Sequence, residues 1–156
     1  MTRILFVCLG NICRSPMAEF VMKHLADEAG RSGEFEIASA ATSAEERGNG
    51  VYPPVRRLLL HHGIDPTGKT ARKMTRSDYS RYDLLIGMDS ANVRSMLKIC
   101  GGDPAHKIAR LLDYTDTPRD ISDPWYTRDF EQTWQDVQAG CRGLLRSLYP
   151  AEGGKD

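Results

Sequence analysis

Residues 4–8 form an uninterrupted apolar run, ILFVC, that contains β-branched and aromatic side chains. The run is short and Gly10 closes it, so it predicts a buried strand of a parallel sheet. Ser15 followed by Pro16 has the pattern of a helix N-cap with proline at the first helical position, and Gly30 is placed to end that helix. The helix is predicted to pack through Met17, Phe20, Val21, His24 and Leu25. The chain therefore opens with a strand, a glycine-containing loop and a helix, which is half of a βαβ unit.

The same alternation continues along the chain. Apolar segments at residues 35–38, 83–88 and 108–112 predict three further strands. Helices are predicted from residue 54 to near Gly63, from residue 89 onward, and along a final amphipathic stripe of Phe130, Trp134, Val137, Cys141, Leu144, Leu145 and Leu148. This order indicates an α/β fold with a parallel sheet covered by helices on both faces. Such sheets bind ligands at the carboxyl ends of their strands, so the loop after the first strand is the expected site.

Length and charge limit the organisation of the chain and its partners. The 156 residues fit one domain, expected over residues 1–150, and the polar residues 151–156 are expected to fray. Twenty-one basic residues balance 21 acidic ones, so no overall field attracts nucleic acid or an anionic membrane surface. Any anion must therefore be held by a local arrangement of donors.

The four cysteines are too sparse for a disulfide scaffold. They form no C-x-x-C pair, and no histidine lies near them at a spacing typical of zinc ligands. The sequence also lacks a recognisable signal peptide and any apolar stretch of about 18 residues. We therefore expect a cytoplasmic protein without membrane insertion and without a metal or other cofactor.

The segment Cys8-Leu9-Gly10-Asn11-Ile12-Cys13-Arg14-Ser15, called the Cys8 loop below, separates a cysteine from an arginine by five residues. Between a strand and a helix, such a loop can point successive backbone N–H groups at an anion, with the helix dipole behind them. Gly10 and Asn11 are residue types that adopt positive φ readily. Arg14 supplies a planar fork that matches two phosphate oxygens. The loop is thus predicted to bind phosphate.

The same environment favours the thiolate form of Cys8 at neutral pH. A thiolate beside a bound phosphate predicts in-line attack at phosphorus and a phosphocysteine intermediate. The alternative is an inert cysteine at a strand end, because C-x5-R also arises by chance. The strand before the loop, the helix after it and the Gly-Asn pair inside it favour catalysis. Neither glycine-rich nucleotide-binding pattern is present.

Residues 7–19, VCLGNICRSPMAE, resemble the signature of the low-molecular-weight protein tyrosine phosphatases. Asp123-Pro124-Trp125-Tyr126 resembles the Asp-Pro-aromatic loop of that family, and the strand end at Met88-Asp89 is also similar. Two separated motifs in the family's order, in a chain of the family's length, make the resemblance specific. It implies a single domain with four parallel strands and an enzyme that hydrolyses phosphotyrosine in proteins.

The resemblance also implies roles for individual residues. Cys8 would be the nucleophile and Arg14 the phosphate clamp, while Ser15 would stabilise the thiolate. Asn11 and Ser39 would brace the loop. Phosphate would be bound by the loop amides, through Leu9, Gly10, Asn11, Ile12, Cys13 and Ser15.

Asp123 is implied as the general acid and then the general base. Expulsion of a phenolate, whose conjugate acid has a pKa of about 10, is easier when its oxygen is protonated. The alternative for Asp-Pro is an ordinary turn. Trp125 and Tyr126 favour the functional interpretation, because they add aromatic walls suited to a phosphorylated ring.

Cys13 has two interpretations that the sequence leaves open. It shares a tightly curled loop with Cys8, so it is a possible redox partner in a reversible disulfide. Simple packing is the alternative, and packing is the expectation for Cys100 and Cys141. The expected partner is a tyrosine-phosphorylated protein, for example a tyrosine kinase, and the sequence does not indicate an oligomeric state.

Two positions depart from the family's pattern. Lys69 stands where a loop-bracing histidine is usual, and residues 42–47, which include Glu45, replace a stretch that often carries a tryptophan. The first change bears on loop support. The second bears on the preference for aromatic phosphoesters and adds acidic charge unfavourable to acidic phosphopeptides.

Three other functions are compatible with parts of this pattern. Arsenate reductases on this fold need two further cysteines close in sequence, whereas Cys100 and Cys141 lie 41 residues apart. Protein-arginine phosphatases carry threonine where Ile12 stands, and a bulky Ile12 suits a tyrosine ring better than a guanidinium. A non-catalytic phosphotyrosine-binding module would lack Cys8 or Asp123, and both are present.

Overall fold

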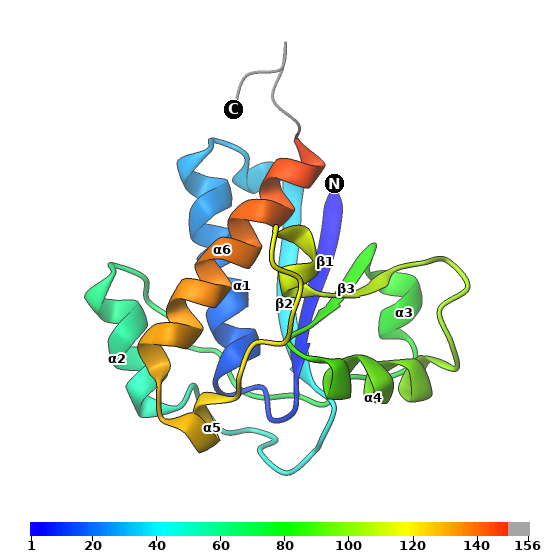
Figure 1. Cartoon of the computed structure of the whole chain (residues 1–156), viewed down its shortest axis with the longest axis horizontal. Helices are drawn as coiled ribbons and strands as arrows, with labels where there is room; N and C mark the ends of the chain where they lie inside the picture. Colours follow the sequence, from blue (N-terminus) through cyan, green and yellow to red (C-terminus); the bar gives the residue numbers. More distant parts are fainter. Residues whose placement is uncertain (150–156) are drawn as a thin grey trace.

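The computed structural model describes residues 1–149 and contains a four-stranded parallel sheet (Figure 1). The strand order is β2-β1-β3-β4, with bounds β1 Thr2–Cys8, β2 Phe35–Ala41, β3 Leu84–Gly87 and β4 Ile108–Arg110. β1 is central, and its register places Cys8 beside Ala41 of β2 and Val7 beside Gly87 of β3. The predicted α/β fold with a parallel sheet is confirmed.

The helices between the strands follow the alternation seen in the sequence. Their bounds are α1 Arg14–Glu28, α2 Pro53–His61, α3 Asp78–Arg81, α4 Ser90–Cys100, α5 Pro124–Thr127 and α6 Phe130–Leu148, with short 3-10 turns η1 at Ser32–Glu34 and η2 at Leu111–Tyr114. The long final helix has the predicted bounds. No helix among the described residues combines the length and apolar character needed to cross a membrane.

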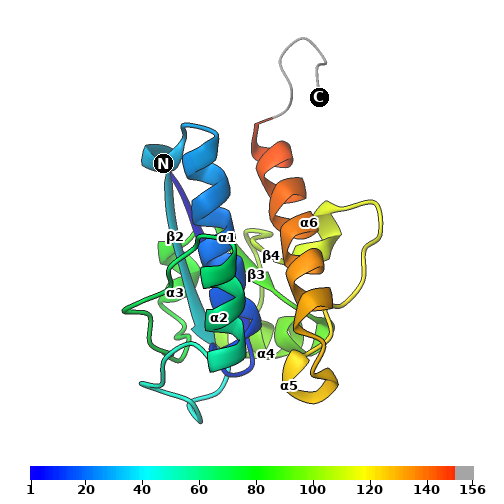
Figure 2. The same ribbon diagram turned by 90° about the vertical axis from the view of Figure 1, so that its left-hand side faces the viewer.

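Helices cover both faces of the sheet, as Figure 2 shows from the side. Alternate side chains of β1 point to opposite faces because a strand repeats every two residues. Ile4 and Phe6 enter the larger core, which α1, α2 and α6 complete, whereas Leu5 and Val7 enter a smaller core completed by α4. All four of these side chains are fully buried, as the unbroken apolar run predicts.

The fourth strand is shorter than predicted. β4 ends at Arg110, whose backbone N–H donates to the Asp113 carboxylate at 3.0 Å, and the chain turns into η2. Leu111 and Leu112 are buried, but they pack in the turn rather than extending the strand. An apolar run alone does not distinguish these two ways of burying its side chains.

The first helix also begins differently from the prediction. Cys13, not Ser15, is the N-cap, and no side chain caps the first turn. Ser15 lies inside the helix because its hydroxyl and its backbone N–H are both directed at the sulfur of Cys8. Gly30 has a φ of 70° just beyond the helix, as expected for a residue that ends one.

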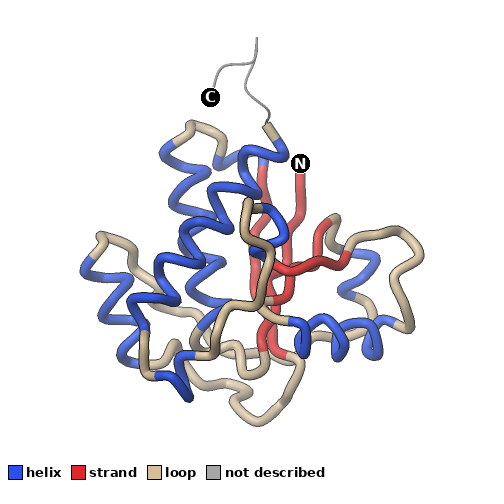
Figure 3. The backbone as a smooth tube through the Cα atoms, in the orientation of Figure 1, coloured by secondary structure: helices blue, strands red, loops and turns tan. Residues whose placement is uncertain are grey.

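The loops that follow β1, β2 and β3 gather at one end of the sheet, the lower end in Figure 3. α5 lies at the same end, below the start of α6 (Figure 1). The fold therefore brings residues from distant parts of the chain to the carboxyl ends of the central strands. The predicted fraying of residues 151–156 lies outside the described residues, as does residue 150 at the end of the predicted domain.

Candidate active site

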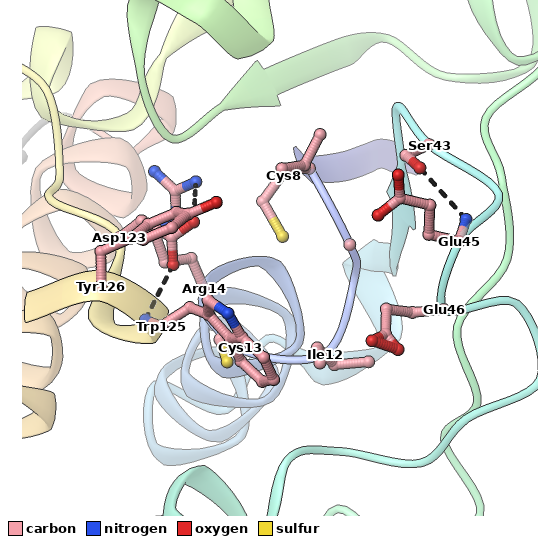
Figure 4. Close-up of a pocket in the computed structure, with 12 residues that line it drawn as sticks. Cys8, Ile12, Cys13, Arg14, Ser43, Glu45, Glu46, Asp123, Trp125 and Tyr126 are labelled. Carbon is pink, nitrogen blue, oxygen red and sulfur yellow. Dashed lines mark hydrogen bonds and ion pairs between the residues drawn. The ribbon is translucent and has the colours of Figure 1, made fainter. Parts of the chain in front are cut away.

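A pocket of about 150 Å³ opens at the carboxyl end of β1 (Figure 4). Three segments line it: the Cys8 loop, the connection after β2, and the turn that contains α5. The lining residues are Cys8, Leu9, Gly10, Ile12, Cys13, Arg14, Ser43, Glu45, Glu46, Asp123, Trp125 and Tyr126. The two sequence motifs, more than 100 residues apart in the chain, thus meet at one cavity.

The curl of the Cys8 loop depends on Asn11 more than on Gly10. Asn11 has a φ of 60°, in the left-handed region that asparagine tolerates better than most residues. Gly10 does not have a positive φ, so that part of the prediction is wrong. A Cβ on Gly10 would lie 3.3 Å from Cγ of Glu46, so a larger residue there would require the Glu46 side chain to shift.

The sulfur of Cys8 lies at the centre of the loop and accepts hydrogen bonds. The backbone N–H groups of Asn11 and Ser15 donate to it at 3.3 and 3.4 Å, and the hydroxyl oxygen of Ser15 lies 3.0 Å away. Cys8 is 3% exposed but lines the pocket. Donors directed at a sulfur favour its anionic form.

A chain of hydrogen bonds fixes the direction of the Ser15 proton. The side-chain NH2 group of Asn11 donates one hydrogen bond to the Ser15 hydroxyl oxygen at 2.8 Å and another to the Ser39 hydroxyl oxygen at 2.9 Å. Its carbonyl oxygen accepts from the Arg72 backbone at 3.2 Å, which sets the orientation of the amide. Ser15 therefore accepts from Asn11 and keeps its own proton for Cys8, the contact at 3.0 Å, rather than for the Ala40 carbonyl at 3.5 Å.

Glu19 anchors the far end of that chain. Its carboxylate is buried and accepts a 2.6 Å hydrogen bond from the Ser39 hydroxyl. Lys69 lies 3.6 Å from this carboxylate and donates to the Ser39 carbonyl at 2.8 Å, so it occupies the loop-bracing position that the sequence left in question. Burial lowers the pKa of Lys69 below its usual value, although the Glu19 charge opposes this. Sequence reasoning gave Glu19 no role.

Arg14 is 2% exposed, and its guanidinium is held from several directions. One nitrogen donates to Asp89 at 2.6 Å and to the Ile121 carbonyl at 2.8 Å, and the other lies 3.4 Å from Asp123. Burial by itself would lower the pKa of Arg14, but the negative groups around it outweigh burial and raise its pKa. Sequence reasoning also gave Asp89 no role, although an acidic residue at the end of a central strand was the available signal.

Asp123 caps α5, because its carboxylate accepts from the Trp125 backbone N–H at 3.0 Å. Asp123, Trp125 and Tyr126 lie on one side of Cys8 (Figure 4). The two aromatic side chains are 45% and 75% exposed, so they form an open rim rather than part of the core. The turn at this Asp-Pro is thus part of the pocket.

The opposite side of the pocket is acidic. Ser43, Glu45 and Glu46 lie across Cys8 from the aromatic rim (Figure 4). The Glu46 carboxylate accepts from the Asn49 amide at 2.9 Å. The segment after β2 that departs from the family's pattern therefore faces the site directly.

Cys13 lines the pocket as well, but its thiol is in a different environment. Burial, together with the charges of Cys8 and Asp123, raises the pKa of Cys13 to about 12. Cys100 and Cys141 do not line the pocket and lie in the separate cores on the two faces of the sheet. None of the four cysteines, all of which lie within the described residues, forms a disulfide. Within residues 1–149, no three or more His, Cys, Asp or Glu side chains are placed to hold a metal ion.

Known proteins are similar to this chain in both sequence and fold. The family described as low molecular weight phosphotyrosine protein phosphatase matches residues 3–152. The low molecular weight protein-tyrosine-phosphatase YfkJ of Bacillus subtilis is 38% identical over 95% of this chain and 96% of its own length. The human low molecular weight phosphotyrosine protein phosphatase is 37% identical over 94% of this chain and 95% of its own.

Solved structures agree with the sequence comparison. The crystal structure of YfkJ superimposes with a TM-score of 0.92 over 95% of this chain and 94% of that one. The crystal structure of DARP, a Drosophila arginine phosphatase, has a TM-score of 0.85 at 25% identity, over 97% of this chain and 99% of that one. This chain belongs to the low molecular weight phosphotyrosine protein phosphatase family.

Proposed function

We propose that this protein hydrolyses phosphotyrosine in proteins through a phosphocysteine intermediate. The observation that carries the proposal is the meeting of Cys8, Arg14 and Asp123 at one pocket, with donors directed at the Cys8 sulfur. A nucleophile, an anion-binding guanidinium and a carboxyl group are the parts that phosphate monoester hydrolysis needs when no metal ion takes part.

In the first step the Cys8 thiolate attacks phosphorus. The sulfur–phosphorus bond forms as the bond to the phenolic oxygen breaks, and the carboxyl group of Asp123 gives that oxygen its proton. Arg14 and the amides of the Cys8 loop bind the remaining phosphoryl oxygens, which carry the charge of the transition state. Tyrosine leaves as the neutral phenol.

In the second step Asp123, now a carboxylate, takes a proton from water. The water oxygen bonds to phosphorus as the sulfur–phosphorus bond breaks, which releases phosphate and restores the thiolate. The Ser15 hydroxyl donates to the sulfur in this state and makes it a better leaving group. One carboxyl group therefore serves as acid and then as base.

The walls of the pocket support an aromatic substrate. Ile12 and Trp125 face the cavity beside Cys8, and Tyr126 stands exposed at the rim. These apolar surfaces suit a flat ring attached to the phosphate. A guanidinium group would find less hydrogen bonding beside the Ile12 side chain. The proposed partner is a tyrosine-phosphorylated protein, and a tyrosine kinase is one such substrate.

The test compares substrates and variants. Cys8→Ser is expected to abolish hydrolysis of para-nitrophenyl phosphate while binding of phosphate persists, because serine keeps the loop but loses the thiolate. Asp123→Ala is expected to slow turnover most for poor leaving groups, by about 100-fold or more for phenyl phosphate. Equal slowing across leaving groups would contradict the role of Asp123 as the acid.

The substrate class is tested side by side. Matched peptides carrying phosphotyrosine, phosphoarginine or phosphoserine are assayed with excess EDTA, and arsenate reduction serves as a control. We expect phosphotyrosine to be hydrolysed fastest and EDTA to have no effect. Faster hydrolysis of phosphoarginine, reduction of arsenate, or loss of activity in EDTA would each overturn a part of the proposal.

The Cys8–Cys13 pair is a separate part of the proposal. One equivalent of peroxide would oxidise the two thiols to a disulfide and release two waters. Peptide mapping should then find Cys8 linked to Cys13, and a thiol reductant should restore activity. Overoxidised Cys8 with no linked peptide would support packing as the role of Cys13.

A further inference from the structure

Tyr52 connects the Cys8 loop to the turn that carries Asp123, yet it does not line the pocket. Its backbone N–H donates to the carbonyl of Ile12 at 2.9 Å, which fixes it to the Cys8 loop. Its ring packs against the ring of Trp125, with centroids 5.0 Å apart and planes inclined at 55°. Contact between these rings joins the beginning of α2 to α5, which lie at the same end of the molecule (Figure 1).

Arg128 also contacts the ring and the hydroxyl of the Tyr52 side chain. Its guanidinium lies 5.5 Å from the centre of that ring and 5.2 Å from the centre of the Phe130 ring, and it donates to the Tyr52 hydroxyl at 3.1 Å. Arg128 also has a φ of 60°, a conformation that costs a non-glycine residue about 1–2 kcal/mol. Its backbone N–H donates to Pro124 at 2.9 Å and closes α5. A strained residue with a fully engaged side chain is a reason to look for a functional constraint.

A hydrogen bond links Trp125, which packs on Tyr52, to the carboxyl group of Asp123. The backbone N–H of Trp125 donates to one Asp123 oxygen at 3.0 Å, and the other oxygen faces Arg14 at 3.4 Å. Trp125 thus packs its ring on Tyr52 and donates its backbone N–H to the carboxyl group of Asp123.

We propose that Tyr52, clamped by Arg128, is a positioning residue for Asp123. By packing against Trp125, it holds the turn that carries Asp123 at a fixed position relative to the Cys8 loop. This inference rests on the proposed function, in which Asp123 protonates the leaving group. General acid catalysis contributes about 100- to 10,000-fold, and a displacement of about 1 Å can remove much of such an effect.

The experiment measures kcat/KM on two aryl phosphates that differ in leaving group. Para-nitrophenolate leaves without much help, whereas phenolate needs a proton. We expect Tyr52→Leu to lower kcat/KM about tenfold for phenyl phosphate and less than about threefold for para-nitrophenyl phosphate. Tyr52→Phe keeps the ring and is expected to stay within about threefold of wild type on both substrates.

Tyr149→Leu is the matched control. Tyr149 also has an arginine over its ring, with Arg31 at 3.8 Å, and its hydroxyl also makes a hydrogen bond, to Glu34 at 2.9 Å. It follows the last turn of α6, whose end lies at the opposite end of the molecule from the Cys8 loop (Figure 1). This variant should lower stability without changing the ratio of the two kcat/KM values.

Arg128→Gly tests the proposal if Tyr52→Leu does not fold, because glycine adopts a φ of 60° without strain. We expect kcat/KM to fall about tenfold for phenyl phosphate and to stay within about threefold of wild type for para-nitrophenyl phosphate. Equal losses on both substrates, or none, in the folded variants would overturn the positioning role while leaving the proposed function intact. Failure of the wild-type protein to hydrolyse either substrate would instead overturn the proposed function.

Discussion

The Cys8 sulfur is surrounded by hydrogen-bond donors whose directions are fixed by residues outside the pocket. Sequence reasoning identified Cys8, Arg14 and Asp123, because the C-x5-R and Asp-Pro motifs are local. It did not identify Glu19 of α1, whose carboxylate accepts a hydrogen bond from the Ser39 hydroxyl near the end of β2. It also placed Ser15 outside the helix, because the preference of serine for N-cap positions is strong and its bond to a sulfur is visible only after folding. Contacts of this kind depend on tertiary packing rather than on spacing.

Cys8 should react with an alkylating reagent at neutral pH faster than the other three cysteines. The raised pKa of Cys13, about 12, means that it is a thiol at pH 7 and becomes a thiolate only as the pH approaches that value. Burial also raises the pKa of Cys100 and Cys141 above the usual value. Limited iodoacetamide at pH 7 should therefore label Cys8 first, phosphate should protect it, and peptide mapping by mass spectrometry checks both. Labelling of another cysteine first would contradict this description of the loop.

Glu19→Gln should weaken the activation of Cys8. A carboxylate only accepts hydrogen bonds, so Ser39 must donate to it, whereas a glutamine amide can donate to Ser39 and allow the chain to reverse. We expect alkylation of Cys8 at pH 7 and kcat/KM each to fall about tenfold, as for the loss of a charge-assisted hydrogen bond of about 1.5 kcal/mol. Glu28→Gln, an exposed change on the same helix, is the control. An unchanged rate of Cys8 alkylation in Glu19→Gln would show that the Glu19 carboxylate does not contribute to the activation of Cys8.

Helices and strands could be predicted where their buried side chains follow a regular apolar pattern along the sequence. The unbroken run of β1 and the stripe of α6 both appear in the structure where the pattern places them. The run after residue 108 was misread, since Leu111 and Leu112 are buried by a 3-10 turn packed on α6. That contact depends on two glycines of α6, which no apolar periodicity reveals. A Cβ on Gly140 would lie 2.4 Å from Leu111, and a Cβ on Gly143 would lie 2.2 Å from the carbonyl oxygen of Tyr114.

Gly143→Ala should therefore destabilise the fold. Alanine is favoured over glycine inside a helix by about 1 kcal/mol, so helix propensity alone predicts a gain in stability. The clash with a backbone carbonyl cannot be relieved by a change of rotamer, and we expect a net loss of about 1–3 kcal/mol. The midpoint of urea unfolding measures it, with Gly33→Ala as the control, because a Cβ there meets nothing within 4 Å. A raised midpoint for Gly143→Ala would show that α6 and η2 are not tightly packed.

The pocket is assembled from segments that the parallel sheet brings to one end. This placement followed from the fold class, because ligands of such sheets bind at the carboxyl ends of the strands. The meeting of Asp123 with Arg14 did not follow from the pattern and rested on the resemblance to the family. The positions of Asp89, at the end of β3, and Tyr52, before α2, needed the folded chain. Sequence thus predicted where the pocket lies and that Cys8, Arg14 and Asp123 line it, and the structure adds the residues that contact these three.

Phosphate binding should raise the free energy of unfolding of the whole domain. A ligand at 100 times its Kd adds about 2.7 kcal/mol, and a domain of this size gains about 2–4 °C in Tm per kcal/mol. We therefore expect inorganic phosphate to raise Tm by about 5–10 °C, with chloride at equal ionic strength as the control. Arg14→Lys should lose most of this ligand-dependent shift, because lysine lacks the fork. An equal shift in that variant would place the bound phosphate elsewhere.

The covalent intermediate tests the central claim most directly. Asp123→Asn lacks the base of the second step, so phosphoenzyme should accumulate when this variant is mixed with para-nitrophenyl phosphate and quenched in acid. Mass spectrometry of the digested protein should then find one phosphoryl group, on the peptide containing Cys8 and bound to its sulfur. A phosphoryl group on any other residue, or nitrophenol release in the first turnover with no phosphorylated protein, would contradict that claim.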